Sequence, residues 1–123
     1  MGVVHRNTGR GTAFNWEGVT TQRYEGGGAS GVMKYILLGA ADGSKNFAVR
    51  YFEVAPGGRT AYDQHQHDHG VFILKGRARV LLGQETVEVC PGDAVHVAPN
   101  EVHQFESIGD EPLGFLCIIP PLE

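Results

Sequence analysis

The sequence predicts an all-β fold built from short antiparallel strands. Short segments alternate between apolar and polar residues, and no segment of ten or more residues shows a helical period. Turn residues, including many of the 18 glycines, recur at intervals of roughly eight to twelve residues, as is typical of all-β domains. Because a closed or sandwich-like antiparallel arrangement hides the unpaired edges of its strands, we expect that architecture here.

The first 30 residues have the weakest strand pattern of the chain. Two glycine-rich stretches, 8–12 and 25–31, indicate loops, and Trp16 between them can anchor an edge segment. We therefore expect one domain made of an N-terminal arm and edge strand, residues 1–30, followed by the barrel itself, residues 31–123.

Alternating and apolar runs place the strands of the barrel. A turn at Pro56-Gly57-Gly58 is expected to end one strand, and Lys75-Gly76 predicts a tight hairpin between two others. The expected strands are 33–38, 46–54, 60–66, 71–74, 77–82, 86–90, 94–98, 102–107 and 113–119.

Charge and hydropathy argue against several kinds of partner. The net charge is −4 and the ten lysines and arginines are scattered, so we expect no nucleic-acid partner. No apolar stretch approaches the roughly 18–20 residues that span a bilayer, so we expect no membrane partner. Residues 1–7 lack the basic region and apolar core of a signal peptide, which predicts a cytoplasmic protein with reduced Cys90 and Cys117.

Three histidines lie at alternating positions in the segment Asp63-Gln-His65-Gln-His67-Asp-His69. Residues i, i+2 and i+4 of an extended chain share one face, so Asp63 and all three imidazoles are expected to point the same way. Imidazole is a common ligand for zinc, copper, iron and nickel. The segment therefore predicts a metal site on one face of a sheet.

Two sequence motifs here resemble those of the cupin superfamily, in particular its small, single-domain bacterial type. In the first, Gly57-Gly58 precedes the histidines, and His69 is followed after six residues by Gly76. In the second, Gly92 begins the motif, Asn100 holds a glycine position and His103 holds the histidine position. Asn tolerates the positive φ of a turn almost as glycine does. The resemblance implies an antiparallel double-sheet jelly-roll barrel, a metal between the two motifs and a homodimer.

The resemblance also assigns the ligands of one divalent transition metal ion. His69 takes the position of the family's glutamate, and His65 and His103 take histidine positions. The fourth ligand is either His67 or Asp63, and we favour His67 because Asp63 can instead orient a ligand from outside the coordination sphere. The donor set does not distinguish iron, manganese, copper, nickel and zinc.

Three further residues are candidates for the pocket wall. Phe105 shares a face with His103, Cys117 belongs to the alternating row 113–119, and Tyr62 lies next to the first motif. The sequence leans towards a metal-dependent enzyme that acts on a small molecule in the manner of an oxygenase. The alternatives are a metal-dependent isomerase or lyase, and a non-catalytic module that binds a small molecule or a metal.

Overall fold

The computed structural model describes residues 2–121 and has the predicted all-β architecture. In these residues the one helical element is the short 3-10 helix η1 (Ala40–Asp42), and no helix is long and apolar enough to cross a membrane. The strands are β1 (Thr20–Tyr24), β2 (Ser30–Leu38), β3 (Ala48–Arg59), β4 (His69–Lys75), β5 (Ala78–Leu82), β6 (Glu85–Val89), β7 (Ala94–Val97), β8 (His103–Ser107) and β9 (Leu113–Ile119).

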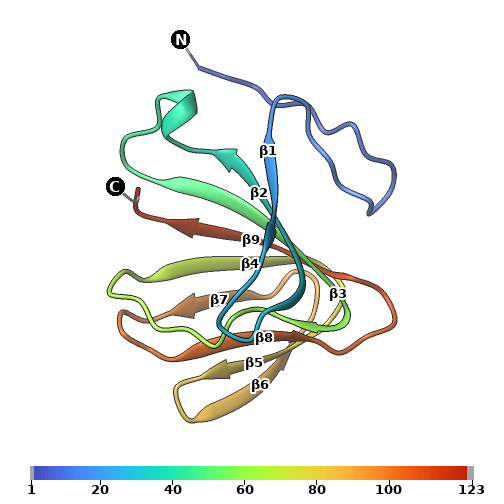
Figure 1. The fold of residues 1–123 in the computed structure, drawn as a ribbon, viewed down its shortest axis with the longest axis vertical. Coiled ribbons are helices and arrows are strands. Elements are labelled where there is room, and N and C mark those ends of the chain that lie inside the picture. The colour runs from blue at the N-terminus through green and yellow to red at the C-terminus, as the bar shows by residue number, and fades with distance from the viewer. Residues whose placement is uncertain (1, 122–123) are drawn as a thin grey trace.

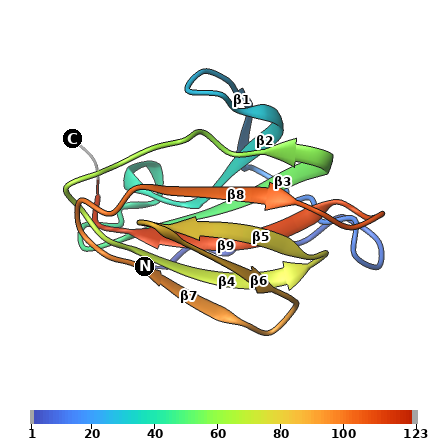
Figure 2. The same ribbon diagram turned by 90° about the horizontal axis from the view of Figure 1, so that it is seen from below.

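The strands form one antiparallel sheet that curls into two facing layers (Figures 1 and 2). The larger layer has the order β1-β2-β3-β9-β4-β7, and the smaller layer has the order β6-β5-β8. The long strand β3 joins the layers, because it pairs with β9 along most of its length and with β8 through Arg59 and Glu106. This arrangement confirms the predicted double-sheet jelly roll.

The apolar core lies between the two layers and is formed by the inward residues of the alternating strands. Phe105 of the smaller layer stacks on Phe115 of the larger layer with ring centroids 4.8 Å apart. Phe52, Val80 and Ile73 are also buried in this core. Burial of these side chains is the main force that holds the layers together.

Two predicted connections are wrong, and both errors concern glycine turns. The Pro56-Gly57-Gly58 segment does not end a strand, because β3 continues through it to Arg59 with a register shift against β2. Lys75-Gly76 is not a hairpin either. The strand before it, β4, pairs with β7 and β9, whereas β5 pairs with β6 and β8, so the chain changes layers at this point.

The N-terminal arm packs on the outer face of the larger layer. Phe14 and Trp16 stack with centroids 5.8 Å apart, and Trp16 meets the buried ring of Tyr51 at 5.1 Å. The buried Lys75 ammonium donates to the Thr12 carbonyl. β1 then forms an edge strand beside β2. The division into an arm, 1–30, and a barrel, 31–123, stays a prediction. The end residues of these two ranges, 1 and 122–123, lie outside the described chain.

Candidate metal centre

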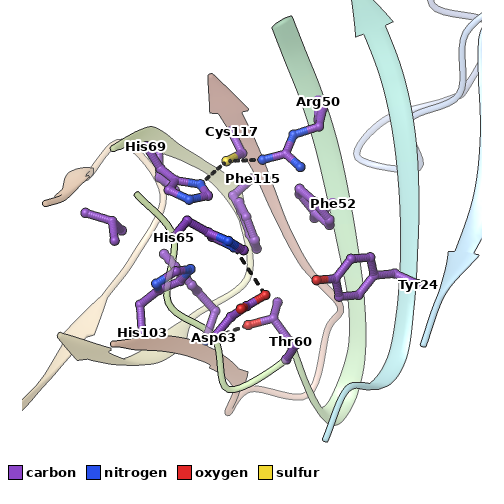
Figure 3. A pocket seen from close by; sticks show the side chains of 14 residues that line it. Tyr24, Arg50, Phe52, Thr60, Asp63, His65, His69, His103, Phe115 and Cys117 are labelled. Atoms are coloured by element: carbon purple, nitrogen blue, oxygen red, sulfur yellow. Dashed lines mark hydrogen bonds and ion pairs between the residues drawn. The ribbon is translucent and has the colours of Figure 1, made fainter. Parts of the chain in front are cut away.

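Three imidazoles from two distant parts of the sequence meet inside the barrel. His69 begins β4, His103 begins β8, and His65 lies in the connection before β4. One ring nitrogen from each lies within 4.8 Å of the others. The ring centroids are 5.0–5.3 Å apart, and Figure 3 shows the rings facing the same pocket.

The connection that carries His65 is not the predicted strand 60–66, but its side chains alternate as they would in one. Residues 63, 65 and 67 are half-buried, whereas 62, 64, 66 and 68 are exposed. Two backbone contacts keep the segment extended. Asp63 forms an isolated antiparallel β-bridge with His103, and the Asn100 amide donates to the His65 carbonyl at 2.6 Å. Asn100 has the positive φ of 63° that its motif position predicts. The expected common face therefore exists without the expected strand ladder.

The hydrogen bonds of the rings leave one nitrogen of His103 and one nitrogen of His69 without a protein partner in the described structure. His103 donates from Nδ1 to the Glu101 carbonyl at 3.0 Å, which leaves the lone pair on its Nε2. His69 Nδ1 lies 3.2 Å from the Cys117 sulfur, and its buried Nε2 has no hydrogen-bond partner in the described structure. An unpaired buried nitrogen is costly, and a metal ion would satisfy it.

The protonation states suit a metal as well. Burial lowers the pKa of His69 to about 3, and the nearby His103, Arg50 and His67 add to this effect. Burial likewise lowers the pKa of His65. Both rings are therefore neutral near pH 7, and a neutral imidazole is the form that binds metal. The three histidines could bind a metal ion.

Neither candidate for the fourth ligand belongs to the group of three close nitrogens. The Asp63 carboxylate lies 3.1 Å from His65 Nε2 through Oδ2 and accepts the Gln64 amide through Oδ1. The His67 ring stacks on His65 with centroids 4.9 Å apart and lies outside the pocket lining. Asp63 lines the pocket, so a carboxylate is available on the pocket side of the cluster.

A pocket that is open to solvent lies in front of the imidazoles. Phe105 and Cys117 line it, as expected from their strand faces. Tyr62 does not line the pocket. It is 60% exposed, because it is one of the alternate residues of this segment that point outward. The lining residues are Tyr24, Arg50, Phe52, Thr60, Ala61, Asp63, His65, His69, Val71, Val97, His103, Phe105, Phe115 and Cys117.

Two ionisable residues of the pocket, Tyr24 and Arg50, were given no role by sequence reasoning. Tyr24 lies in β1, whose strand pattern is weak, and it reaches the pocket through the pairing of β1 with β2. Burial and the nearby Asp63 carboxylate raise the pKa of Tyr24. Arg50 is directly opposite Cys117 on the neighbouring strand, so the two share the inner face. Arg50 lies two residues before the core residue Phe52 and therefore shares its inward face. This spacing is the signal that could have placed Arg50 inside the barrel.

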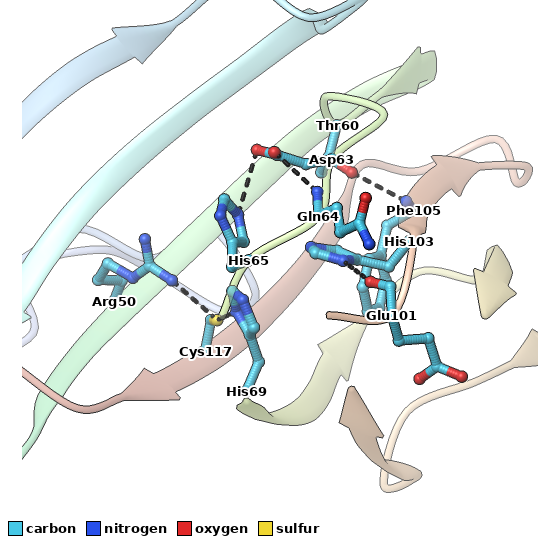
Figure 4. A network of polar contacts seen from close by, with 10 residues as sticks. All are labelled: Arg50, Thr60, Asp63, Gln64, His65, His69, Glu101, His103, Phe105 and Cys117. Atoms are coloured by element: carbon cyan, nitrogen blue, oxygen red, sulfur yellow. Dashed lines mark hydrogen bonds and ion pairs between the residues drawn. The ribbon is translucent and has the colours of Figure 1, made fainter. Parts of the chain in front are cut away.

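A guanidinium, a thiol and an imidazole form one polar chain at the pocket wall (Figure 4). Arg50 Nη2 donates to the Cys117 sulfur at 3.1 Å, and His69 Nδ1 meets the same sulfur. Burial raises the pKa of the Cys117 thiol, against the opposing effect of the guanidinium. The sulfur therefore acts as the outer partner that fixes the orientation of the His69 ring.

Comparison with known proteins identifies the fold family. A sequence model of the cupin domain family matches residues 50–119. The chain is 38% identical to the 1-methylthio-D-xylulose 5-phosphate methylsulfurylase of Rhodospirillum rubrum over 109 residues, which cover 86% of this chain and 69% of the relative.

Solved structures give the same result. A cupin-2 domain protein from Rhodospirillum rubrum superposes with a TM-score of 0.82 at 35% identity, covering 91% of this chain and 76% of that one. The polyketide cyclase RemF from Streptomyces resistomycificus gives a TM-score of 0.76 at 28% identity, covering 84% of this chain and 74% of that one. The chain therefore belongs to the cupin domain family.

Proposed function

We propose that this cupin is a metal-dependent enzyme that acts on a small molecule held in front of His65, His69 and His103. The observation that carries the proposal is the buried His69 Nε2, which has no protein partner in the described chain and faces two more imidazoles. These three rings would hold the ion, and a bound divalent transition metal would polarise a substrate oxygen as a Lewis acid.

The pocket contains groups that can move protons beside the imidazoles, which supports an enzyme over a simple binding module. The Asp63 carboxylate is adjacent to His65 and can accept a proton from a bound substrate. The Tyr24 hydroxyl points towards Asp63 from the opposite wall (Figure 3) and can donate one. Two of the similar proteins, the methylsulfurylase and the polyketide cyclase, are named as enzymes.

These groups favour the isomerase or lyase type of reaction over the oxygenase type that the sequence suggested. Proton transfer needs a positioned base and acid near a polarised carbonyl, and Asp63 and Tyr24 occupy such positions. The aromatic rings of Phe52, Phe105 and Phe115 give the pocket an apolar wall, against which a bound substrate would exclude water. Excluding water strengthens the electrostatic interactions of a bound substrate.

Deuterium exchange tests this proposal. Pyruvate and dihydroxyacetone phosphate, as small carbonyl probes, are incubated in D₂O with the protein loaded separately with manganese, iron, nickel or zinc, and exchange beside the carbonyl is followed by NMR. We expect metal-dependent exchange that is abolished by a chelator and reduced at least about tenfold in Asp63→Asn.

The same incubations under air and under nitrogen separate the two reaction types. Dioxygen consumption with an iron-loaded or manganese-loaded protein would instead support the oxygenase. Absence of both exchange and dioxygen uptake with every metal would contradict the proposal that these probes represent the substrate class. Absence of bound metal would contradict the metal-dependent enzyme itself.

A further inference from the structure

Arg50 places a positive charge on the wall of the pocket, close to the imidazole cluster. It lies on β3 directly opposite Cys117 of β9, and Cys117 is in turn paired with the β4 residue Val71. His69 precedes Val71 by two residues and therefore shares its inward face. A single sulfur atom, Cys117 Sγ, contacts both the guanidinium and the His69 ring.

The guanidinium has no carboxylate partner within ion-pair distance in the described chain. Its hydrogen-bond contact is the weakly accepting Cys117 sulfur, and its Nε is buried without a partner. The other contact is the Phe52 ring, whose centroid lies 5.1 Å from the guanidinium carbon. Burying most of a charge with so little compensation is unfavourable, unless a ligand supplies the counter-charge.

A second cation lies on the same inner face. Lys34 of β2 is opposite Phe52, the neighbour of Arg50 along the inward row of β3. Its ammonium sits over the Tyr24 ring at 5.7 Å and makes no ion pair with a described residue. Burial and the charge of Arg50 lower the pKa of Lys34. Two neighbouring cations without a bound anion repel each other, so this wall is built to attract negative charge.

We propose that Arg50, supported by Lys34, forms an anion subsite that binds a carboxylate or phosphate group of the substrate. This inference rests on the proposed function, because it names the substrate class of the same pocket. The planar guanidinium donors match the oxygens of either anion, whereas a neutral ligand would leave the charge of Arg50 without a counter-charge.

The position of this subsite limits the substrate further. One sulfur atom separates the guanidinium from His69, so an anion on Arg50 lies beside the imidazole cluster. The Asp63 carboxylate lies on the other side of His65 (Figure 4) and would repel a second anion there. The substrate is therefore a small molecule with its negative charge near the reacting oxygen and an uncharged group towards Asp63.

Binding of two simple anions tests the proposal. Inorganic phosphate and acetate are titrated by calorimetry into the protein as purified and after treatment with a chelator, and the metal content is measured on each sample. We expect at least one anion to bind, and Arg50→Gln to weaken it about tenfold or more with and without metal. Stronger binding of phosphate would indicate a phosphate ester as substrate, and stronger binding of acetate a carboxylic acid.

Three further variants distinguish loss of the anion subsite from loss of folding or of surface charge. Arg50→Lys keeps the charge but loses the fork, so its anion affinity should lie between those of the wild type and Arg50→Gln. Lys34→Gln should weaken binding less than Arg50→Gln does, because Lys34 lies outside the pocket lining. The matched control is Arg79→Gln, which removes an exposed arginine paired with Glu106 and should change nothing.

The outcomes separate this subsite from the metal centre. Anion binding that depends on Arg50 both with and without metal would support the subsite. The same binding in a protein that holds no metal as purified, and takes up none when each candidate ion is added, would support the subsite and contradict the metal-dependent enzyme. Unchanged anion affinity in Arg50→Gln, or no binding of either anion to the wild type, would overturn the subsite and leave the metal proposal standing.

Discussion

Asp63 and His103 exchange two backbone hydrogen bonds, of 3.1 Å and 2.9 Å, and so tie the two histidine motifs together. His65 follows Asp63 by two residues, and the Asn100 amide donates to its carbonyl. The position of His65 relative to His103 is therefore set by the backbone. A site held in this way is preorganised, because the protein need not spend binding energy on ordering its ligands.

Removing any one of the three clustered imidazoles is expected to abolish stoichiometric metal binding. His65→Ala, His69→Ala and His103→Ala should each lower metal affinity more than about 100-fold, since changes even to outer partners of ligands typically cost about 10–100-fold. Calorimetric titration with zinc and elemental analysis measure this. The control is His96→Ala, whose exposed ring pairs with Asp68 and lies outside the cluster. Wild-type affinity in two of the three cluster variants would refute the assignment.

The fourth position can be decided by comparing Asp63→Asn with His67→Ala. The sequence favoured His67, but from the structure we expect the larger loss of metal affinity in Asp63→Asn. Asp63 Oδ2 lies 3.1 Å from His65 Nε2, and Asp63 lines the pocket whereas His67 does not. Asn keeps the size and the hydrogen-bond acceptor but removes the charge that attracts a cation. A larger loss in His67→Ala would instead favour the all-histidine site.

Gly76 is required where the chain changes layers, and a matched pair of variants tests this. Its φ is 74°, and a Cβ added there would lie 2.5 Å from the Pro112 carbonyl oxygen. Gly92 also has a positive φ, of 93°, but a Cβ there would meet nothing within 4 Å. Gly92→Ala should therefore lower the free energy of unfolding only by the conformational cost of a positive φ, about 1–2 kcal/mol. Gly76→Ala should lower it clearly more. Equal free energies of unfolding from denaturant titration would show that the clash is relieved.

The hydrogen bond between His5 and Asp42 is expected to make the stability of the arm depend on pH. The 2.7 Å bond to Asp42 raises the pKa of His5 above 6.5, and the same bond lowers the pKa of Asp42 below 3.8. The folded state thus binds the His5 proton more tightly, so the stabilisation is fully present below pH 6.5 and is lost as pH rises through the folded-state pKa.

On the acid side, the contribution of Asp42 is lost only as pH falls below its ordinary value of 3.8 towards its lower folded-state pKa. NMR titration of His5, together with melting curves of wild type and His5→Gln, measures both effects. The stability difference between the two proteins should be small and should shrink above neutral pH. A difference that grows with pH would have the wrong sign for this pair.

The sequence predicted the strands and their inward faces well, because each strand buries one of its two faces. Alternation placed β5, β8 and β9 close to their true bounds, and it placed Phe105 and Cys117 on the inner face. It also predicted that His65 and His69 share a face, although the chain between them is not paired as a strand. Side-chain alternation requires only an extended backbone, whereas a strand also requires a neighbour.

What the sequence could not predict is which strands become neighbours. The Lys75-Gly76 connection has the composition of a hairpin, but its two strands enter different layers. Tyr24 and Arg50 reach the pocket only because β1 and β3 lie next to the correct partners. Pairing of this kind depends on long-range packing, which local turn chemistry does not encode.

The most direct test of the account is X-ray absorption at the metal edge of the protein as purified, combined with anomalous diffraction from its crystals. The account predicts a stoichiometric divalent transition metal bonded to nitrogen atoms of His65, His69 and His103, with an anomalous peak between the three rings. A metal found elsewhere, or no metal after growth with each candidate ion, would contradict it.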